Sequence, residues 1–110
     1  MSITHIVMFQ FNESASSGDI SAVCQRMLDL KAQCLHPTTR KPYIQGGSGG
    51  KDNSPEGAQA GTTHAFVVEF ASASDRDYYL NEDPVHKRFV ESLSGLIMKS
   101  QVVDFTPGVF

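Results

Sequence analysis

Residues 3–11 of the chain read ITHIVMFQF, and this stretch decides the fold class. Its branched and aromatic side chains alternate along the chain, which predicts a β-strand. A turn and a helix cap follow at Ser16 to Asp19, and the apolar residues then take a helical spacing, which predicts a helix from Ile20 to Leu35. A strand followed by an amphipathic helix indicates a fold that mixes both kinds of element.

The rest of the chain continues this succession of strands and helices. The glycine-rich stretch from Gly46 to Gly50 and the polar loop that runs on to Gly61 interrupt this succession. We expect both to be flexible, and we expect Gly46 to Gly50 to form a mobile rim of a pocket. The other predicted elements are a short strand from Lys41 to Ile44, a strong strand from Thr62 to Ala71, a helix capped at Ser72 to Ser74, its restart at Pro84 with a continuation from His86 to Ile97, and a closing strand from Ser100 to Thr106.

The predicted order of elements is βαββαβ, an α+β arrangement known as the split βαβ unit. We expect its first and third strands to be adjacent and parallel at the centre of one sheet. Helices then cover one face of the sheet and leave the other face open.

The composition limits both the size and the partners of the protein. A chain of 110 residues is long enough to bury the core of a single domain spanning residues 1–110. A formal net charge of −3, with lysine and arginine scattered among acids, argues against nucleic acid and membrane surfaces as partners. The chain has no apolar run of membrane-spanning length and its first residues lack the pattern of a signal peptide, so we expect a cytoplasmic protein.

Three of the four histidines fall on otherwise apolar faces of predicted elements. His5 and His64 lie near the starts of two strands that are expected to be parallel neighbours, so they should sit side by side at one end of the sheet. Tyr79 and His86 belong to the helical segment that returns over the same face. Imidazoles beside a phenol in an apolar pocket suit acid/base chemistry on a small carbonyl compound, whereas one such histidine alone is more often a core residue.

Neither a metal site nor a disulfide is predicted. The histidines lack the close spacing of a dedicated zinc or copper site, and no carboxylate shares their inward faces. Cys24 and Cys34 fall in one predicted helix about 15 Å apart, which is too far for a disulfide. We therefore expect two reduced thiols with a packing role.

Several segments together carry a family pattern. They are HIVMFQF at residues 5–11, NSPEG at 53–57, THAFVVEFAS at 63–72, YYLNEDPVHKRFV at 78–90 and VVDFTP at 102–107. In these segments the chain resembles the stress-responsive A/B barrel domain family, also called Dabb. The resemblance implies a ferredoxin-like fold and a dimeric α+β barrel, in which two sheets pack face to face in a homodimer. The partner would then bury the open sheet face, which carries Ile6, Met8, Ala65 and Val67.

The family includes polyketide cyclases of the olivetolic acid cyclase type, and the resemblance extends to the residues of their site. It implies that His86 is a general base that removes an acidic α-proton, with Tyr79 holding either the base or the substrate carbonyl. It also implies that His5 and His64 shape the polar end of the pocket. Phe66 and Phe89, which share faces with His64 and His86, complete the expected substrate-binding residues.

The chain departs from those cyclases in the spacing of Tyr79 and His86. The segment from Tyr79 to His86 is one residue longer here, so the two side chains could be turned relative to each other.

Three functions remain open at this point. The first is a cofactor-free acid/base enzyme, a cyclase or lyase that acts on a polyketide-like or aromatic carbonyl compound. The second is a cofactor-free monooxygenase of phenolic substrates, as in related dimeric α+β barrels. The third is a non-enzymatic stress-responsive oligomer, which the binding of a small-molecule substrate would distinguish from the other two.

Overall fold

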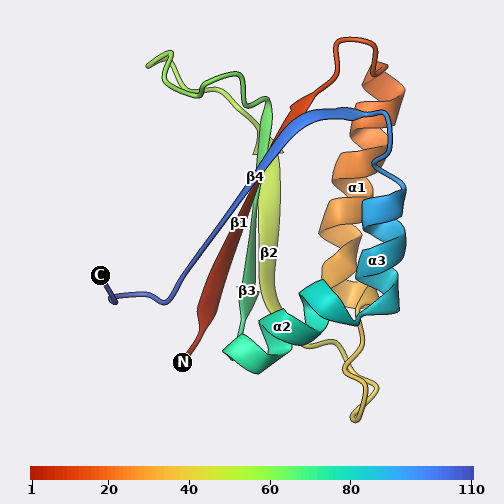
Figure 1. The fold of residues 1–110 in the computed structure, drawn as a ribbon, viewed down its shortest axis with the longest axis vertical. Helices are drawn as coiled ribbons and strands as arrows, with labels where there is room; N and C mark the ends of the chain where they lie inside the picture. The colour runs from red at the N-terminus through yellow and green to blue at the C-terminus, as the bar shows by residue number, and fades with distance from the viewer.

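Strand β1, Ile3–Phe11, forms where the sequence alternates, and every second side chain along it is buried. The structure is a computed structural model that describes residues 1–110. Figure 1 shows the sheet nearly edge-on, with the helices on one side of it. The remaining elements are α1 (Ser17–Gln33), β2 (Ile44–Lys51), β3 (His64–Phe70), α2 (Ala73–Asn81), α3 (Pro84–Glu91) and β4 (Ile97–Phe105).

The predicted helix caps are confirmed, although α1 begins at Ser17 rather than at Ile20. Ser16 Oγ accepts a hydrogen bond from the Asp19 N–H at 3.0 Å, and Ser72 Oγ accepts one from the Asp75 N–H at 3.2 Å. Asp83 caps α3, with Pro84 in the first helical turn. The second predicted helix is therefore divided into α2 and α3.

The end of α3 differs from the prediction, which continued the helix to Ile97. The helix ends at Glu91, and the chain turns before β4 begins at Ile97. Gly95 has a φ of 80°, a left-handed conformation that an α-helix cannot contain.

The sheet has the strand order β2-β3-β1-β4, and every neighbouring pair is antiparallel. The predicted parallel pairing of the first and third strands is wrong. Helix α1 returns the chain so that β2 runs parallel to β1, but β3 lies between them and follows β2 through a loop without a helix. Strand β3 therefore runs opposite to both of its neighbours.

The glycine-rich stretch is strand rather than loop. It forms most of the edge strand β2, in which Gly49 pairs with Phe66 of β3. A Cβ atom at Gly49 would meet the carbonyl oxygen of Ala65 at 2.7 Å and the ring of Phe66. Glycine permits this close approach, and the expectation of a mobile rim over residues 46–50 is corrected.

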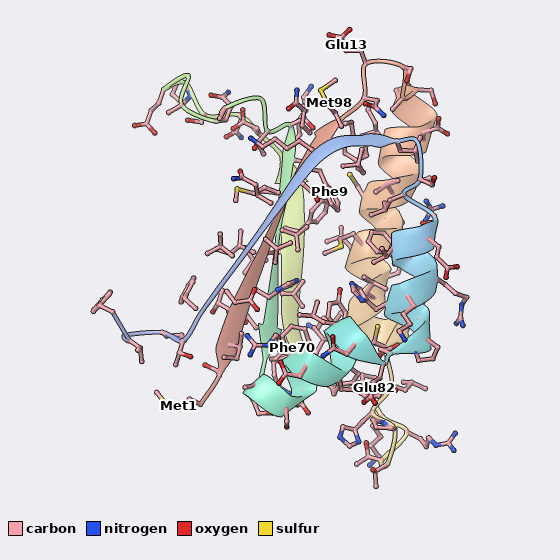
Figure 2. The ribbon with its side chains drawn as sticks, viewed as in Figure 1. Met1, Phe9, Glu13, Phe70, Glu82 and Met98 are labelled. Atoms are coloured by element: carbon pink, nitrogen blue, oxygen red, sulfur yellow. The ribbon has the colours of Figure 1, made fainter.

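The core lies between the inner face of the sheet and the helices. Figure 2 shows Phe9 and Phe70 within this layer. Both are buried, together with Val23, Met27 and Leu30 of α1. No helix covers the outer face of the sheet, and no helix of the chain is long and apolar enough to cross a membrane.

Candidate active site

A cavity of about 190 Å³ lies between the inner face of β1 and β4 and the helices α2 and α3. Most of its lining is apolar. Three polar rings line the same cavity from three different elements. They are the imidazoles of His5 and His86 and the phenol of Tyr79. The other lining residues are Val7, Phe9, Met27, Leu80, Phe89, Val90, Leu93, Ser100 and Val102.

Tyr79 and His86 form the closest pair in this cavity. Their ring centroids are 3.9 Å apart with planes at 33°, because the break at Asp83 folds the start of α3 back against the end of α2. The longer segment between them therefore still brings the rings into contact. Tyr79 is fully buried, and neither its hydroxyl nor His86 Nδ1 has a hydrogen-bond partner.

These two unpaired polar atoms are unusual. Leaving a buried donor or acceptor unsatisfied costs roughly 1–3 kcal/mol, so such groups call for an explanation. Both belong to residues that line one cavity, and both atoms are closed off from solvent in this structure.

His5 is held differently. It is buried, and its Nδ1–H donates to Asp104 Oδ1 of β4 at 2.6 Å, since a carboxylate can only accept. Arg76 of α2 donates to the other oxygen of Asp104 at 3.0 Å. This arrangement directs Nδ1 of His5 toward Asp104 and fixes the orientation of the ring. The ring stands edge-on to Tyr79, at 6.0 Å between centroids.

The surroundings shift the pKa values of the pair in opposite directions. Burial raises the pKa of Tyr79, and the nearby Cys34 and Asp83 add to this effect. Burial lowers the pKa of His86 below its ordinary value of 6.5, with a further contribution from His5, while Asp83 and the main chain of Tyr79 act in the opposite direction. At neutral pH the cavity therefore holds a protonated phenol beside a neutral imidazole.

His64 is not part of this cavity, so the prediction that it lies beside His5 is wrong. In the antiparallel register His5 pairs with Val68, whereas His64 pairs with Phe9, near the other end of β1. His64 Nδ1 lies 3.0 Å from Thr63 Oγ1, and its ring packs edge-on against Phe11.

That end of the sheet has its own groove of about 680 Å³, which His64 and Lys51 help to line. Burial, followed by the charge of Lys51, lowers the pKa of His64.

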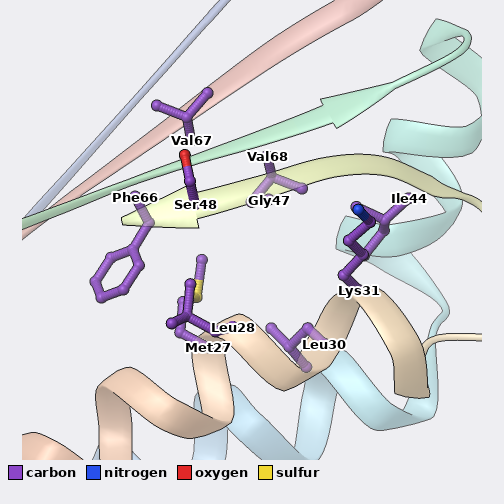
Figure 3. A pocket seen from close by; sticks show the side chains of 10 residues that line it. All are labelled: Met27, Leu28, Leu30, Lys31, Ile44, Gly47, Ser48, Phe66, Val67 and Val68. Carbon is purple, nitrogen blue, oxygen red and sulfur yellow. The ribbon is translucent and has the colours of Figure 1, made fainter. Parts of the chain in front are cut away.

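Of the two predicted aromatic residues, Phe89 lines the cavity and Phe66 does not. Phe66 lies in the core, 5.9 Å from the ring of Phe9 between centroids. The cavity beside it is only about 10 Å³, scarcely room for one water molecule. Figure 3 shows the side chains that line this small cavity between α1 and the strands β2 and β3. The roles of His64 and Phe66 in substrate binding stay predictions.

Asp104 and Arg76, which hold His5 in place, are not among the residues predicted from the sequence. A signal for Asp104 was present, because it interrupts the apolar closing strand in the segment VVDF. Its partner could be identified only from the register that sets Asp104 opposite His5. Arg76 carries no comparable signal, since charged residues are normal on a helix.

No group of three or more histidine, cysteine, aspartate or glutamate residues is placed to hold a metal ion. Cys24 and Cys34 are both free thiols in this structure, and Cys34 lies at the C-cap of α1 rather than inside the predicted helix.

Comparisons with known proteins give a family and a fold. The profile of the stress responsive A/B barrel domain, Dabb, matches residues 3–107. No curated protein sequence matches the chain. Among solved structures, a protein from Arabidopsis thaliana has a TM-score of 0.82 at 24% identity, over 98% of this chain and 97% of that chain.

Two further solved structures have the same fold. A hydroxynitrile lyase from Passiflora edulis has a TM-score of 0.81 at 21% identity, over 99% of this chain and 96% of that chain. A dimeric ferredoxin-like protein of unknown function from Thermobifida fusca has a TM-score of 0.74 at 19% identity, over 96% and 91% respectively. These similarities establish a ferredoxin-like α+β fold.

Proposed function

The chain belongs to the stress-responsive A/B barrel domain family, and on this premise we propose that it is a cofactor-free acid/base enzyme of the lyase type. Its substrate is a small carbonyl compound or the hydroxy compound that yields one. The reaction takes place in the cavity of His5, Tyr79 and His86.

One observation carries this proposal. The Tyr79 hydroxyl and His86 Nδ1 are buried without partners and belong to two rings that contact each other and line the same cavity. Two unsatisfied polar groups are costly in a folded protein unless a ligand pairs with them. The combination of a perturbed histidine and a phenol in an apolar cavity is typical of an active site.

The shifted pKa values indicate a division of labour. His86, whose pKa is lowered, is neutral at pH 7 and accepts a proton from the substrate. Tyr79, whose pKa is raised, keeps its proton and donates a hydrogen bond to the substrate oxygen. His5 is oriented by Asp104 and contributes the polar wall opposite them.

The size of the cavity narrows the substrate class. A cavity of about 190 Å³ exceeds the ~150 Å³ that binds benzene but lies below the range typical of drug-sized ligands. A compound with one aromatic ring fits this volume better than a long polyketide chain. The fold shared with a hydroxynitrile lyase suggests cyanohydrins as the first compounds to try.

The experiment is an assay of the purified protein with an aromatic cyanohydrin and with aromatic β-hydroxy ketones, following release of the aldehyde. We expect turnover that falls by about 10²- to 10⁴-fold in His86→Asn, the usual contribution of a general base. His36→Asn is the matched control, because His36 is a half-buried histidine outside the cavity and its replacement should leave the rate unchanged.

The alternative functions predict other results. Oxygen consumption with phenols would indicate a monooxygenase. The absence of both turnover and ligand binding at the cavity would overturn the enzyme proposal and favour a non-enzymatic oligomer.

We further propose that the protein is a homodimer that buries the outer face of the sheet. This face carries apolar side chains, including Val103 and Phe105 of β4, each of which is about half exposed. Contiguous apolar surface of this kind marks an interaction site. Solved structures of the same fold are described as dimeric ferredoxin-like proteins, which supports a second copy of the chain as the partner.

A further inference from the structure

Asp83 is a buried carboxylate without a cationic partner. Only 1% of its surface is exposed, and none of the ion pairs in the structure includes it. Its Oδ2 accepts a hydrogen bond from the Tyr43 hydroxyl at 2.6 Å. Its Oδ1 accepts from the N–H groups of Val85 and His86, at 2.9 and 3.4 Å.

Capping alone does not account for this arrangement. A helix cap needs one acceptor oxygen, and serine, threonine or asparagine can serve as well as aspartate. Here the second oxygen is held by a tyrosine 40 residues away in sequence, and the group is removed from water, where a charge is costly. The N-terminus of α3 stabilises part of this charge, but no cationic side chain neutralises it.

The groups around Asp83 leave one candidate for a counter-charge. Cys34 and Tyr43 lie against it and cannot become cations, and the same is true of Tyr78 and Tyr79. His86 belongs to the helix that Asp83 caps, and its imidazole is the nearby group that can gain a positive charge.

We propose that Asp83, held by Tyr43, is a positioning residue that stabilises the imidazolium formed when His86 accepts the substrate proton. This inference rests on the proposed function. His86 is neutral before the reaction and positive after it takes the proton, so an adjacent carboxylate favours the later state more than the resting one. Such a difference lowers the barrier, because only interactions that strengthen toward the transition state accelerate the chemical step.

The electrostatics of His86 are consistent with this role. The titratable groups around His86 are His5 from β1, Cys34 at the end of α1, Tyr79 from α2 and Asp83 at the start of α3. Burial and His5 lower the pKa of His86, and Asp83 opposes them. Without Asp83, the imidazolium would have no negative group to offset its burial.

The test is an NMR titration of the histidine rings in wild type and in Asp83→Asn, which retains a side chain that caps helices well. We expect the midpoint of His86 to move to lower pH in the variant, while that of His64, near the other end of the strand pair, does not move. Asp19→Asn is the matched control, since Asp19 lies exposed in the first turn of α1 and should leave every histidine unchanged.

A purely structural role would not produce this result. If the variant folds and the midpoint of His86 stays or rises, the proposal is overturned. If Asp83→Asn fails to fold, Asp83→Ser provides the same comparison, because serine also caps the helix and carries no charge.

Kinetics separate this inference from the proposed function. We expect kcat of Asp83→Asn to fall roughly tenfold with little change in KM, since the carboxylate acts after the substrate is bound. Lack of turnover by the wild-type protein would overturn the function, whereas the titration needs no substrate and tests the coupling of Asp83 to His86 directly.

Discussion

Tyr79 shows at the scale of a single residue how a side chain suited to ligand binding differs from one that only fills the core. Its ring is fully buried and packs on Phe70 and His86, but its hydroxyl has no partner within the chain. A tyrosine that served only the core would gain stability by losing that hydroxyl.

This reasoning predicts the behaviour of Tyr79→Phe. The variant should unfold at an equal or higher urea concentration than wild type, because no hydrogen bond is lost and a buried unsatisfied group is removed. Its turnover should fall by about tenfold or more, because the hydrogen bond to the substrate oxygen is lost. The measurements are urea unfolding and the aldehyde assay.

Tyr78→Phe is the control for this experiment. Tyr78 is the neighbouring residue, is only partly buried and does not line the cavity. The Tyr78→Phe variant should leave turnover unchanged. Equal losses of turnover in Tyr78→Phe and Tyr79→Phe would contradict a specific role for the Tyr79 hydroxyl.

The histidines also predict how stability depends on pH. Burial lowers the pKa values of His64 and His86 below 6.5 in the folded protein. As the pH falls through about 6.5, the unfolded chain therefore takes up protons before the folded protein does. The free energy of unfolding should decrease in this range and level off below the folded pKa values.

Urea unfolding at about pH 7.5 and about pH 5.5 measures this effect, above the range where most carboxylates titrate. His86→Asn should show a smaller loss of stability between the two values than wild type, because one of the two contributing groups is gone. An unchanged dependence would mean that His86 is not buried in its neutral form.

At the scale of elements, the edge strand β2 shows why glycine is needed in a strand. Gly49 lies opposite Phe66, and the backbone of Ala65 occupies the place that a side chain would take. The next glycine, Gly50, faces open space, with no atom within 4 Å of an added Cβ. Two neighbouring glycines in one strand therefore have different requirements.

We expect Gly49→Ala to destabilise the protein by about 1–3 kcal/mol, the usual cost of overpacking, because backbone atoms cannot move aside as a flexible side chain can. Gly50→Ala should be neutral or slightly stabilising, since alanine restricts the unfolded chain. Thermal or urea unfolding of both variants provides the comparison. Equal effects would show that β2 does not approach β3 as closely as the register requires.

At the scale of the whole molecule, helices cover one face of the sheet and the proposed dimer covers the other. Val103→Lys places a charge on that outer face, at the edge strand β4, where Val103 pairs with Ile6 of β1. We expect the variant to be a monomer by light scattering after size-exclusion chromatography, because burying an unpaired ammonium is costly.

Ala22→Lys is the matched control for this prediction. It adds the same charge to an exposed position of α1, on the helical side of the molecule. This variant should keep the oligomeric state of the wild type. A wild-type protein that elutes as a monomer would contradict the proposed dimer.

Local patterns determined most of the elements. The alternation of residues 3–11, the caps at Ser16 and Ser72 and the break at Pro84 depend on neighbouring residues, so they could be predicted from the chain alone. Tyr79 and His86 could be paired for the same reason, because the helix break that joins them is local. The resemblance of separated segments was sufficient to predict the ferredoxin-like fold.

The tertiary structure decided everything that depends on strand direction. A period of two residues predicts which face His5 and His64 occupy, but not whether their strands run parallel, so these residues were placed together although they lie near opposite ends of the strand pair. The edge strand of glycines has no side-chain pattern to detect and is defined by its pairing with β3. Asp104 and Tyr43 acquire their roles only where distant segments meet, since a hydrogen bond across the fold leaves no periodic trace in the sequence.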